Sequence, residues 1–197
     1  MTENQDKKIR IVWTSEHNCI RVVKQVRALV KTGKYDIHGL AKQVSYGTQD
    51  FDKFSFYHNQ KQFKNLIRDL DADLYVHSNE PNIQLNWIRE VQPDAKIILD
   101  AHDLDSVRLG ILPIEEHQAI TNCDGILFVS KEVQAFILDL HRDQMRDKPT
   151  AVLEHYCNEE FLTDSCNPSP EKRKGIVYQG GAQSPPYKNS QYKYRQL

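Results

Sequence analysis

The sequence contains no long hydrophobic run, because its apolar stretches are only a handful of residues in length. A membrane-spanning helix needs roughly 20 such residues, so no transmembrane segment is expected. The N-terminal stretch MTENQDKKIR has neither an apolar run nor a small-residue cleavage site, which argues against a secretory signal. We therefore expect a cytoplasmic protein, and the length of 197 residues suits one core-forming domain with room for little more.

Cysteine is scarce and scattered, at Cys19, Cys123, Cys157 and Cys166. No pair has the CxxC spacing typical of zinc sites or of thioredoxin-type redox sites. The cysteines are therefore interpreted as incidental reduced thiols of an intracellular chain.

Glycine is missing from the first strand-to-helix turn, residues 14–19. A dinucleotide site needs GxGxxG there so that the backbone can approach the pyrophosphate, and the GxxxxGK[ST] loop of P-loop proteins is absent as well. Binding of NAD or FAD, and with it a Rossmann-like oxidoreductase, is disfavoured.

Three D-x-D triplets, at 69–71, 71–73 and 103–105, could hold a divalent cation, but the chain has 27 acidic residues and such triplets arise readily by chance. No metal is expected.

The charge is unevenly distributed along the chain. Residues 171–197 hold six basic residues and one acidic residue, a net charge of +5, so residues 1–170 carry -6 and the sum is the total of -1. A basic terminus of this kind is usually a solvated tail. Nucleic-acid binding is not expected, and peripheral contact with an anionic membrane is left open.

Short β-branched runs alternate with segments of helical period, the pattern of a parallel sheet with crossover helices. Expected strands cover 9–13, 35–42, 54–57, 74–77, 96–100, 125–129, 150–153 and 175–179. Expected helices cover 19–32, 63–70, 82–91, 115–122 and 133–140, the last capped by Ser130. The predicted fold class is α/β, a Rossmann-like parallel sheet with helices on both faces.

The stretch CNPSP at 166–170 interrupts all regular structure, as connections between domains often do. We predict a Rossmann-like N-terminal domain at 1–165, a linker at 166–173, and the start of a truncated C-terminal domain at 174–197. The strand at 175–179 has no helix after it to cover it.

Ligands of open parallel sheets bind beyond the carboxyl ends of the strands. In this sequence those positions are 14–21, 77–82, 100–105, 130–131 and 154–158. They are rich in histidine, which can act as a general base or as a hydrogen-bond donor to an oxyanion. Each such histidine can equally be a hydrogen-bonded structural residue, and His102 is the strongest candidate for a functional one.

Several segments share the order and pattern of motifs in a known family. They are RVVKQVRALVKTG at 21–33, DADLYVHS at 71–78, LDAHD at 99–103, NCDGILFVSK at 122–131, EHYCNEEF at 154–161 and GIVYQGG at 175–181. Together they resemble the N-terminal, acceptor-side domain of GT-B-fold glycosyltransferases, in particular glycosyltransferase family 4 (group 1). The first turn lacks the glycines of many members, and Tyr156-Cys157 stands where the family has Asn-Gly.

The resemblance implies an enzyme that transfers a sugar from a nucleotide-diphosphate sugar to a hydroxyl acceptor, without a metal or other cofactor. It implies that His102 is catalytic and reaches the donor from the acceptor side, and that Gly180 and Gly181 bind the donor phosphates. The implied acceptor-binding residues are Ser15, Glu16, His17, Asn18, Arg21, His77 and Asp103.

The donor-binding carboxylates and basic residues of that family would lie in a C-terminal domain or partner subunit that this sequence does not contain. The isolated chain is therefore expected to be inactive. Two alternatives stay open: a non-catalytic Rossmann-like binding module, and one part of a split transferase.

Overall fold

The computed structural model describes residues 7–43, 46–78 and 81–155. These residues form one compact unit. The predicted linker, the strand expected at 175–179, Gly180 and Gly181 lie outside the described residues, and the proposed division into domains stays a prediction.

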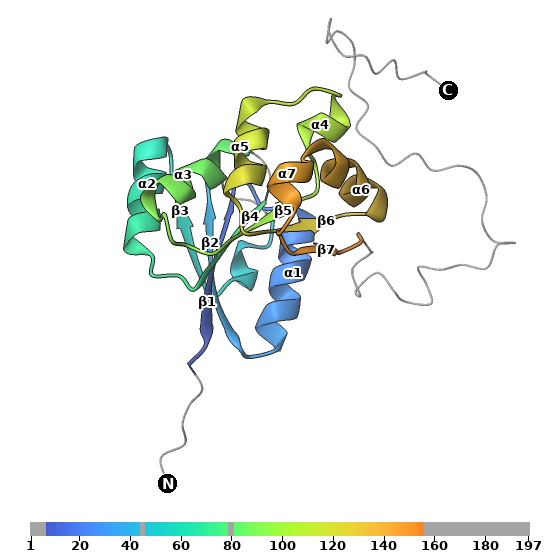
Figure 1. Cartoon of the computed structure of the whole chain (residues 1–197). Helices are drawn as coiled ribbons and strands as arrows, with labels where there is room; N and C mark the ends of the chain where they lie inside the picture. The colour runs from blue at the N-terminus through green and yellow to red at the C-terminus, as the bar shows by residue number, and fades with distance from the viewer. Residues whose placement is uncertain (1–6, 44–45, 79–80, 156–197) are drawn as a thin grey trace, which may run out of the picture. The chain divides into compact units, whose positions relative to one another are not determined.

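Strands in the described part form one seven-stranded sheet in which every pairing is parallel. They are β1 (Ile9–Ser15), β2 (Tyr35–Ala41), β3 (Lys53–Phe56), β4 (Leu74–Ser78), β5 (Ile97–Ala101), β6 (Gly125–Phe128) and β7 (Thr150–Val152). Their order across the sheet is β3-β2-β1-β4-β5-β6-β7 (Figure 1). The order therefore reverses between β1 and β4, and a switch of this kind leaves a crevice beyond the carboxyl ends of the strands.

Helices connect the strands, as the alternating pattern predicts. They are α1 (Ile20–Lys31), α2 (Gln60–Asp69), α3 (Ile83–Val91), α4 (Asp105–Arg108), α5 (Ile114–Asn122), α6 (Lys131–Leu140) and α7 (Arg142–Met145), with the 3₁₀ turn η1 (Thr48–Asp50). The Ser130 hydroxyl caps α6 by accepting a hydrogen bond from the backbone N–H of Val133 at 3.3 Å, as expected. The short elements η1, α4 and α7 were not predicted.

The sheet separates two apolar layers, because successive side chains of a strand point to opposite faces. On one face, Ile11 and Trp13 pack against Val22 and Val26 of α1. On the other face, Val12 belongs to the larger cluster that α2, α3, α5, α6 and α7 cover, with Phe63, Leu85, Ile120, Ile137 and Met145. The expected fold class, a Rossmann-like sheet with helices on both faces, is confirmed.

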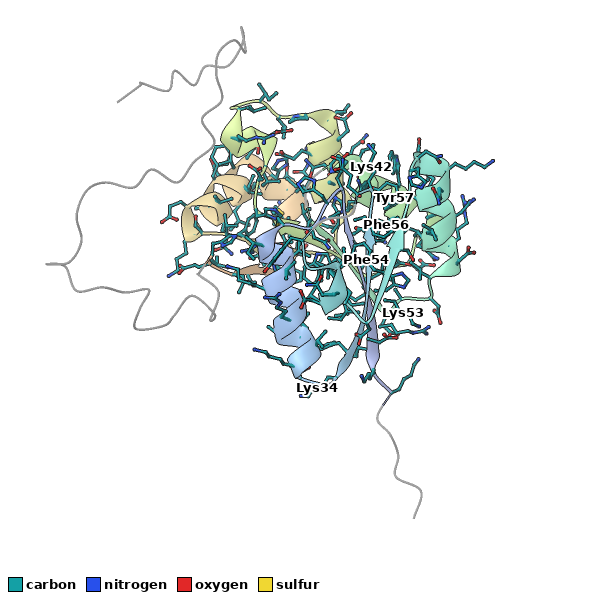
Figure 2. The ribbon with its side chains drawn as sticks, turned by 180° about the vertical axis from the view of Figure 1, so that it is seen from behind. Lys34, Lys42, Lys53, Phe54, Phe56 and Tyr57 are labelled. Atoms are coloured by element: carbon teal, nitrogen blue, oxygen red, sulfur yellow. The ribbon has the colours of Figure 1, made fainter. Side chains whose placement is uncertain are left out.

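The edge strand β3 packs closely on its neighbour β2. A Cβ atom added at Gly39 of β2 would overlap the ring of Phe54 of β3, so the glycine allows that ring to approach the backbone of β2 closely. Figure 2 shows Phe54 between Lys53 and Phe56 along β3, with Lys42 and Tyr57 near the carboxyl ends of the strands and Lys34 at the opposite end of the domain. Within the described residues, no helix combines the length and apolar character needed to cross a membrane.

Candidate functional site

A pocket of about 530 Å³ opens beyond the carboxyl ends of the central strands. Its walls come from the residue after β1, the segment between β4 and α3, the segment after β5, and the start of α5. The lining residues are Glu16, Pro81, Asn82, Ile83, Asp103, Asp105, Pro113 and Glu115. The pocket therefore lies beside the switch point between β1 and β4, where the topology places a binding site.

Three of the four acidic side chains that line this pocket are held by basic neighbours. Glu16 pairs with Lys42 at 3.1 Å, and Arg108 pairs with Asp103 at 3.4 Å and with Asp105 at 2.6 Å. These pairs fix carboxylate oxygens at the mouth of the pocket without burying them. Carboxylates accept hydrogen bonds and do not donate them when ionised, so the pocket suits a ligand rich in hydroxyl or amine donors.

Beside the pocket, Arg21 and Asp100 form a buried ion pair. Their side chains are 3% and 0% exposed, and Nη2 of Arg21 lies 2.9 Å from Oδ1 of Asp100. Arg21 also donates through Nε to Oδ1 at 2.9 Å, and Gln25 donates to Oδ2 at 2.8 Å. Nη1 of Arg21 donates to the carbonyl oxygen of Leu153 at 2.7 Å. One residue of α1 thus connects the ends of β5 and β7.

His102 follows β5 and contacts both Asp100 and Cys19. Its Nδ1 lies 3.1 Å from the backbone oxygen of Asp100 and 3.7 Å from Oδ2 of the same residue. Its Nε2 lies 3.7 Å from Sγ of Cys19. Burial, the largest single influence, lowers the pKa of His102, but the hydrogen bonds with Cys19 and with the backbone of Asp100 and the charges of these two residues together raise it overall.

His77 lies deeper, at the end of β4, and is fully buried. Its Nδ1 is 2.9 Å from the hydroxyl of Thr14 on the neighbouring strand. Burial lowers its pKa to about 3, with a smaller contribution from the charge of His102 and opposing ones from the backbone at Pro81 and Thr14. The side chain is therefore a neutral hydrogen-bonding group beneath the site.

The first turn divides into buried and open positions. Ser15 and Asn18 are buried, with the Ser15 hydroxyl 3.2 Å from Oδ1 of Asn18. Glu16 lines the pocket, and His17 is exposed to solvent and does not line it.

Most of the predicted site residues lie at the end of the sheet where the strands have their carboxyl ends, and they form two groups. Of the residues assigned to the acceptor, Glu16 and Asp103 line the pocket, while Arg21 and His77 are buried and bonded to protein groups.

Sequence reasoning missed the contact of Cys19 with His102. The available signal was a cysteine at a helix start together with a histidine beyond a buried strand. Among the described residues, no group of three or more His, Cys, Asp and Glu side chains could hold a metal ion.

The geometry defines a parallel α/β domain with a pocket at its topological switch. No family model matches the chain, and no curated protein matches it. The solved structure of UGT2 from Phytolacca americana, complexed with UDP-2fluoro-glucose and pterostilbene, aligns with a TM-score of 0.50 and 8% identity over 79% of this chain and 56% of that chain.

Two further solved structures align less well. UGT73P12 from Glycyrrhiza uralensis, complexed with glycyrrhetinic acid 3-O-monoglucuronide, has a TM-score of 0.49 and 12% identity over 73% of this chain and 48% of that chain. A short-chain dehydrogenase/reductase from Veillonella parvula has a TM-score of 0.43 and 12% identity over 62% of this chain and 69% of that chain. The fold is thus similar to that of UGT2, and this chain spans about half the length of UGT2 and of UGT73P12.

Proposed function

We propose that this chain is the acceptor-side domain of a GT-B glycosyltransferase that transfers a sugar from a nucleotide-diphosphate sugar to a hydroxyl acceptor. The observation that carries the proposal is the pocket beside the β1–β4 switch point, lined by Glu16, Asp103, Asp105 and Glu115. Carboxylates at the ends of strands can accept hydrogen bonds from the hydroxyl groups of an acceptor and so orient it. The similarity of the fold to that of UGT2 supports the same class.

His102 is proposed to face the donor from the acceptor side. The carbonyl oxygen of Asp100 can only accept a hydrogen bond, so it requires a proton on Nδ1 of His102. When protonated on both nitrogens, His102 is a cation that can stabilise the charge developing on a departing diphosphate. The pKa of His102, raised by Cys19 and Asp100 against the effect of burial, favours this form. Gly180 and Gly181 stay assigned to the donor phosphates by the sequence resemblance.

The first test is binding of hydroxylated acceptors to the 197-residue chain, measured by ligand-observed NMR on a panel of mono- and disaccharides and phenolic alcohols. The variant Asp103→Asn combined with Glu16→Gln should weaken binding at least about tenfold, because each lost charge-assisted hydrogen bond contributes about 1.5 kcal/mol or more. The matched control is Glu90→Gln, which changes an exposed acid on α3 away from the pocket. Equal binding by the two variants would count against the acceptor role.

The second test is sugar transfer from radiolabelled UDP-glucose. The 197-residue chain alone should be inactive, and a longer protein that joins this chain to a donor-binding half should be active. His102→Ala in that longer protein should lower the rate at least about tenfold. A binding module would keep its ligand affinity in that variant and transfer nothing in either form.

A further inference from the structure

Cys19 occupies an unusual position at the start of α1. It is the N-cap residue of this helix, yet its side chain makes no capping hydrogen bond, although Ser, Thr, Asp or Asn is preferred there. The thiol is partly exposed. A helix N-terminus favours a negative charge, so this position stabilises a thiolate more than it stabilises a thiol.

The second feature is the imidazole in contact with the sulfur. Nε2 of His102 lies 3.7 Å from Sγ of Cys19. Nδ1 of His102 faces the backbone oxygen of Asp100 at 3.1 Å, and this oxygen requires the proton of a neutral imidazole to be on Nδ1. Nε2 then presents a lone pair to the sulfur and can take the thiol proton, as in nucleophile–base pairs of cysteine enzymes.

Asp100 orients the histidine and is itself held in place. Its carboxylate is fully buried and bonded to Arg21 and Gln25, and Oδ2 lies 3.7 Å from Nδ1 of His102. Cys19, His102 and Asp100 therefore supply a nucleophile, a base, and a residue whose backbone oxygen orients the base while its carboxylate places a negative charge nearby. The ion pair with Arg21 attaches Asp100 to α1, the helix whose N-cap residue is Cys19.

Other titratable and charged groups surround the pair. Arg21 stands in the first turn of α1, and His77 of β4 feels the charge of His102. His155, beyond β7, lies 3.3 Å from Nζ of Lys24 and feels the charges of Lys24, Arg21 and His102. The charge of Arg21 is balanced by its ion pair with Asp100, so it is the contact with His102 and the helix N-terminus that favour a thiolate at Cys19.

The titration of Cys19 agrees with this geometry. Burial, the largest influence, raises its pKa, but the hydrogen bond with His102, the backbone at Val22 and Arg21 and the charge of His102 together lower it below the usual value. Cys123 provides an internal contrast. It is buried in the core beside Ile120, and burial raises its pKa to about 11.

We infer that Cys19 is a reactive thiol that undergoes exchange with low-molecular-weight disulfides, with His102 as its base and Asp100 as the positioning residue. In this step the proton of Sγ moves to Nε2 of His102, and the thiolate attacks one sulfur of the disulfide RS–SR. The new bond joins Cys19 to SR, the old S–S bond breaks, and RS⁻ leaves and takes up the proton. The disulfide supplies the oxidising equivalents.

The adduct would lie against His102 and at the turn that carries Glu16 into the pocket. Modification of Cys19 would therefore convert the thiol that faces His102 into a disulfide, which has no proton to donate, and place a bulky group beside the proposed acceptor site. The inference concerns the reactivity of the thiol, and it stands whether or not the domain takes part in sugar transfer.

The experiment uses the full chain with Cys157→Ser and Cys166→Ser, which leaves Cys19 and Cys123. The probe is 5,5′-dithiobis(2-nitrobenzoic acid), a disulfide whose released thiolate is coloured, and the reaction is followed from about pH 5 to pH 9 with N-acetylcysteine as the reference thiol. We expect one fast phase of one equivalent, whose pH midpoint lies below that of the reference. Adding Cys19→Ser should remove this phase, and Cys123→Ser should leave it unchanged.

His102→Asn tests the base. For each unit by which this variant raises the pKa of Cys19, the reaction below that pKa should slow about threefold, because a tenfold loss of thiolate is partly offset by its greater nucleophilicity. Circular dichroism checks that the variant folds. A direct ultraviolet titration of the thiolate in the parent chain gives the midpoint without any change at His102. A midpoint at or above that of N-acetylcysteine, or a fast phase that survives Cys19→Ser, would overturn the inference.

Discussion

The buried histidine His77 gives the domain a dependence of stability on pH that can be calculated. The side chain is fully buried and its pKa is about 3, below the ordinary 6.5. Between these two values the unfolded chain binds a proton that the folded chain does not. The contribution of a neutral His77 is therefore fully present above pH 6.5 and is lost progressively as the pH falls toward the folded-state pKa.

A pH of about 5 is about 1.5 units below the pKa of histidine in the unfolded chain. Each unit corresponds to about 1.4 kcal/mol, so His77 alone should lower the free energy of unfolding by about 2 kcal/mol relative to neutral pH. The assay is urea unfolding of the full chain, followed by circular dichroism at about pH 7 and about pH 5. In His77→Asn the amide can still form a hydrogen bond with the hydroxyl of Thr14. The decrease in the free energy of unfolding from about pH 7 to about pH 5 should be about 2 kcal/mol smaller in this variant than in the parent chain.

The matched control for this measurement is His17→Asn, because His17 is an exposed histidine of the first turn. It should keep the pH dependence of the parent chain. The comparison is between losses of stability on acidification, so the constant cost of altering a buried side chain cancels. If the parent and His77→Asn lost the same stability between the two pH values, the assignment of a neutral, buried His77 would be refuted.

Three other substitutions test the packing around the site by urea or thermal unfolding. Arg21→Met should cost about 3 to 5 kcal/mol, because it leaves the buried carboxylate of Asp100 without its partner; a cost below 1 kcal/mol would show that the pair is solvated. Gly39→Ala should cost about 1 to 3 kcal/mol, since its new methyl group displaces the ring of Phe54, and an unchanged melting temperature would contradict the close approach. Ser130→Ala should cost about 1 kcal/mol through the lost cap of α6. Ser130→Asp should keep the stability of the parent chain, because Asp caps helices as well as Ser does.

Elements with a clear period were predictable from the sequence. Helix α2 follows the apolar spacing of Phe63, Leu66, Ile67 and Leu70, and the strands follow from runs of β-branched residues. The short elements η1, α4 and α7 could not be predicted in this way, because a segment of about one turn is too short to show a helical period.

The site was predictable as a location and not as a set of contacts. Because ligands of open parallel sheets bind beyond the carboxyl ends of the strands, the sequence places Glu16, His102 and Asp103 together at that end of the sheet, and the structure has them there. The contact between Cys19 and His102 joins residues 83 positions apart, and the one between Arg21 and Asp100 joins residues 79 positions apart. Such pairings depend on the register of β1, β4 and β5 and on how α1 packs across them, which a single sequence does not specify.

The order of the strands also constrains how the domain forms during synthesis. Of the strands of this sheet, β1 leaves the ribosome before the others, and it lies in the middle of the sheet between β2 and β4. While β2 and β3 are being added on one side, the other edge of β1 stays open until residues 74–78 have emerged. During that interval the backbone groups of Ile11, Val12 and Trp13 on that edge are unpaired and their apolar side chains are incompletely covered, the kind of surface through which nascent chains aggregate. A slow step in making α2 or β4 would lengthen this exposure, so chaperone dependence of this domain should be greatest before its midpoint has been translated.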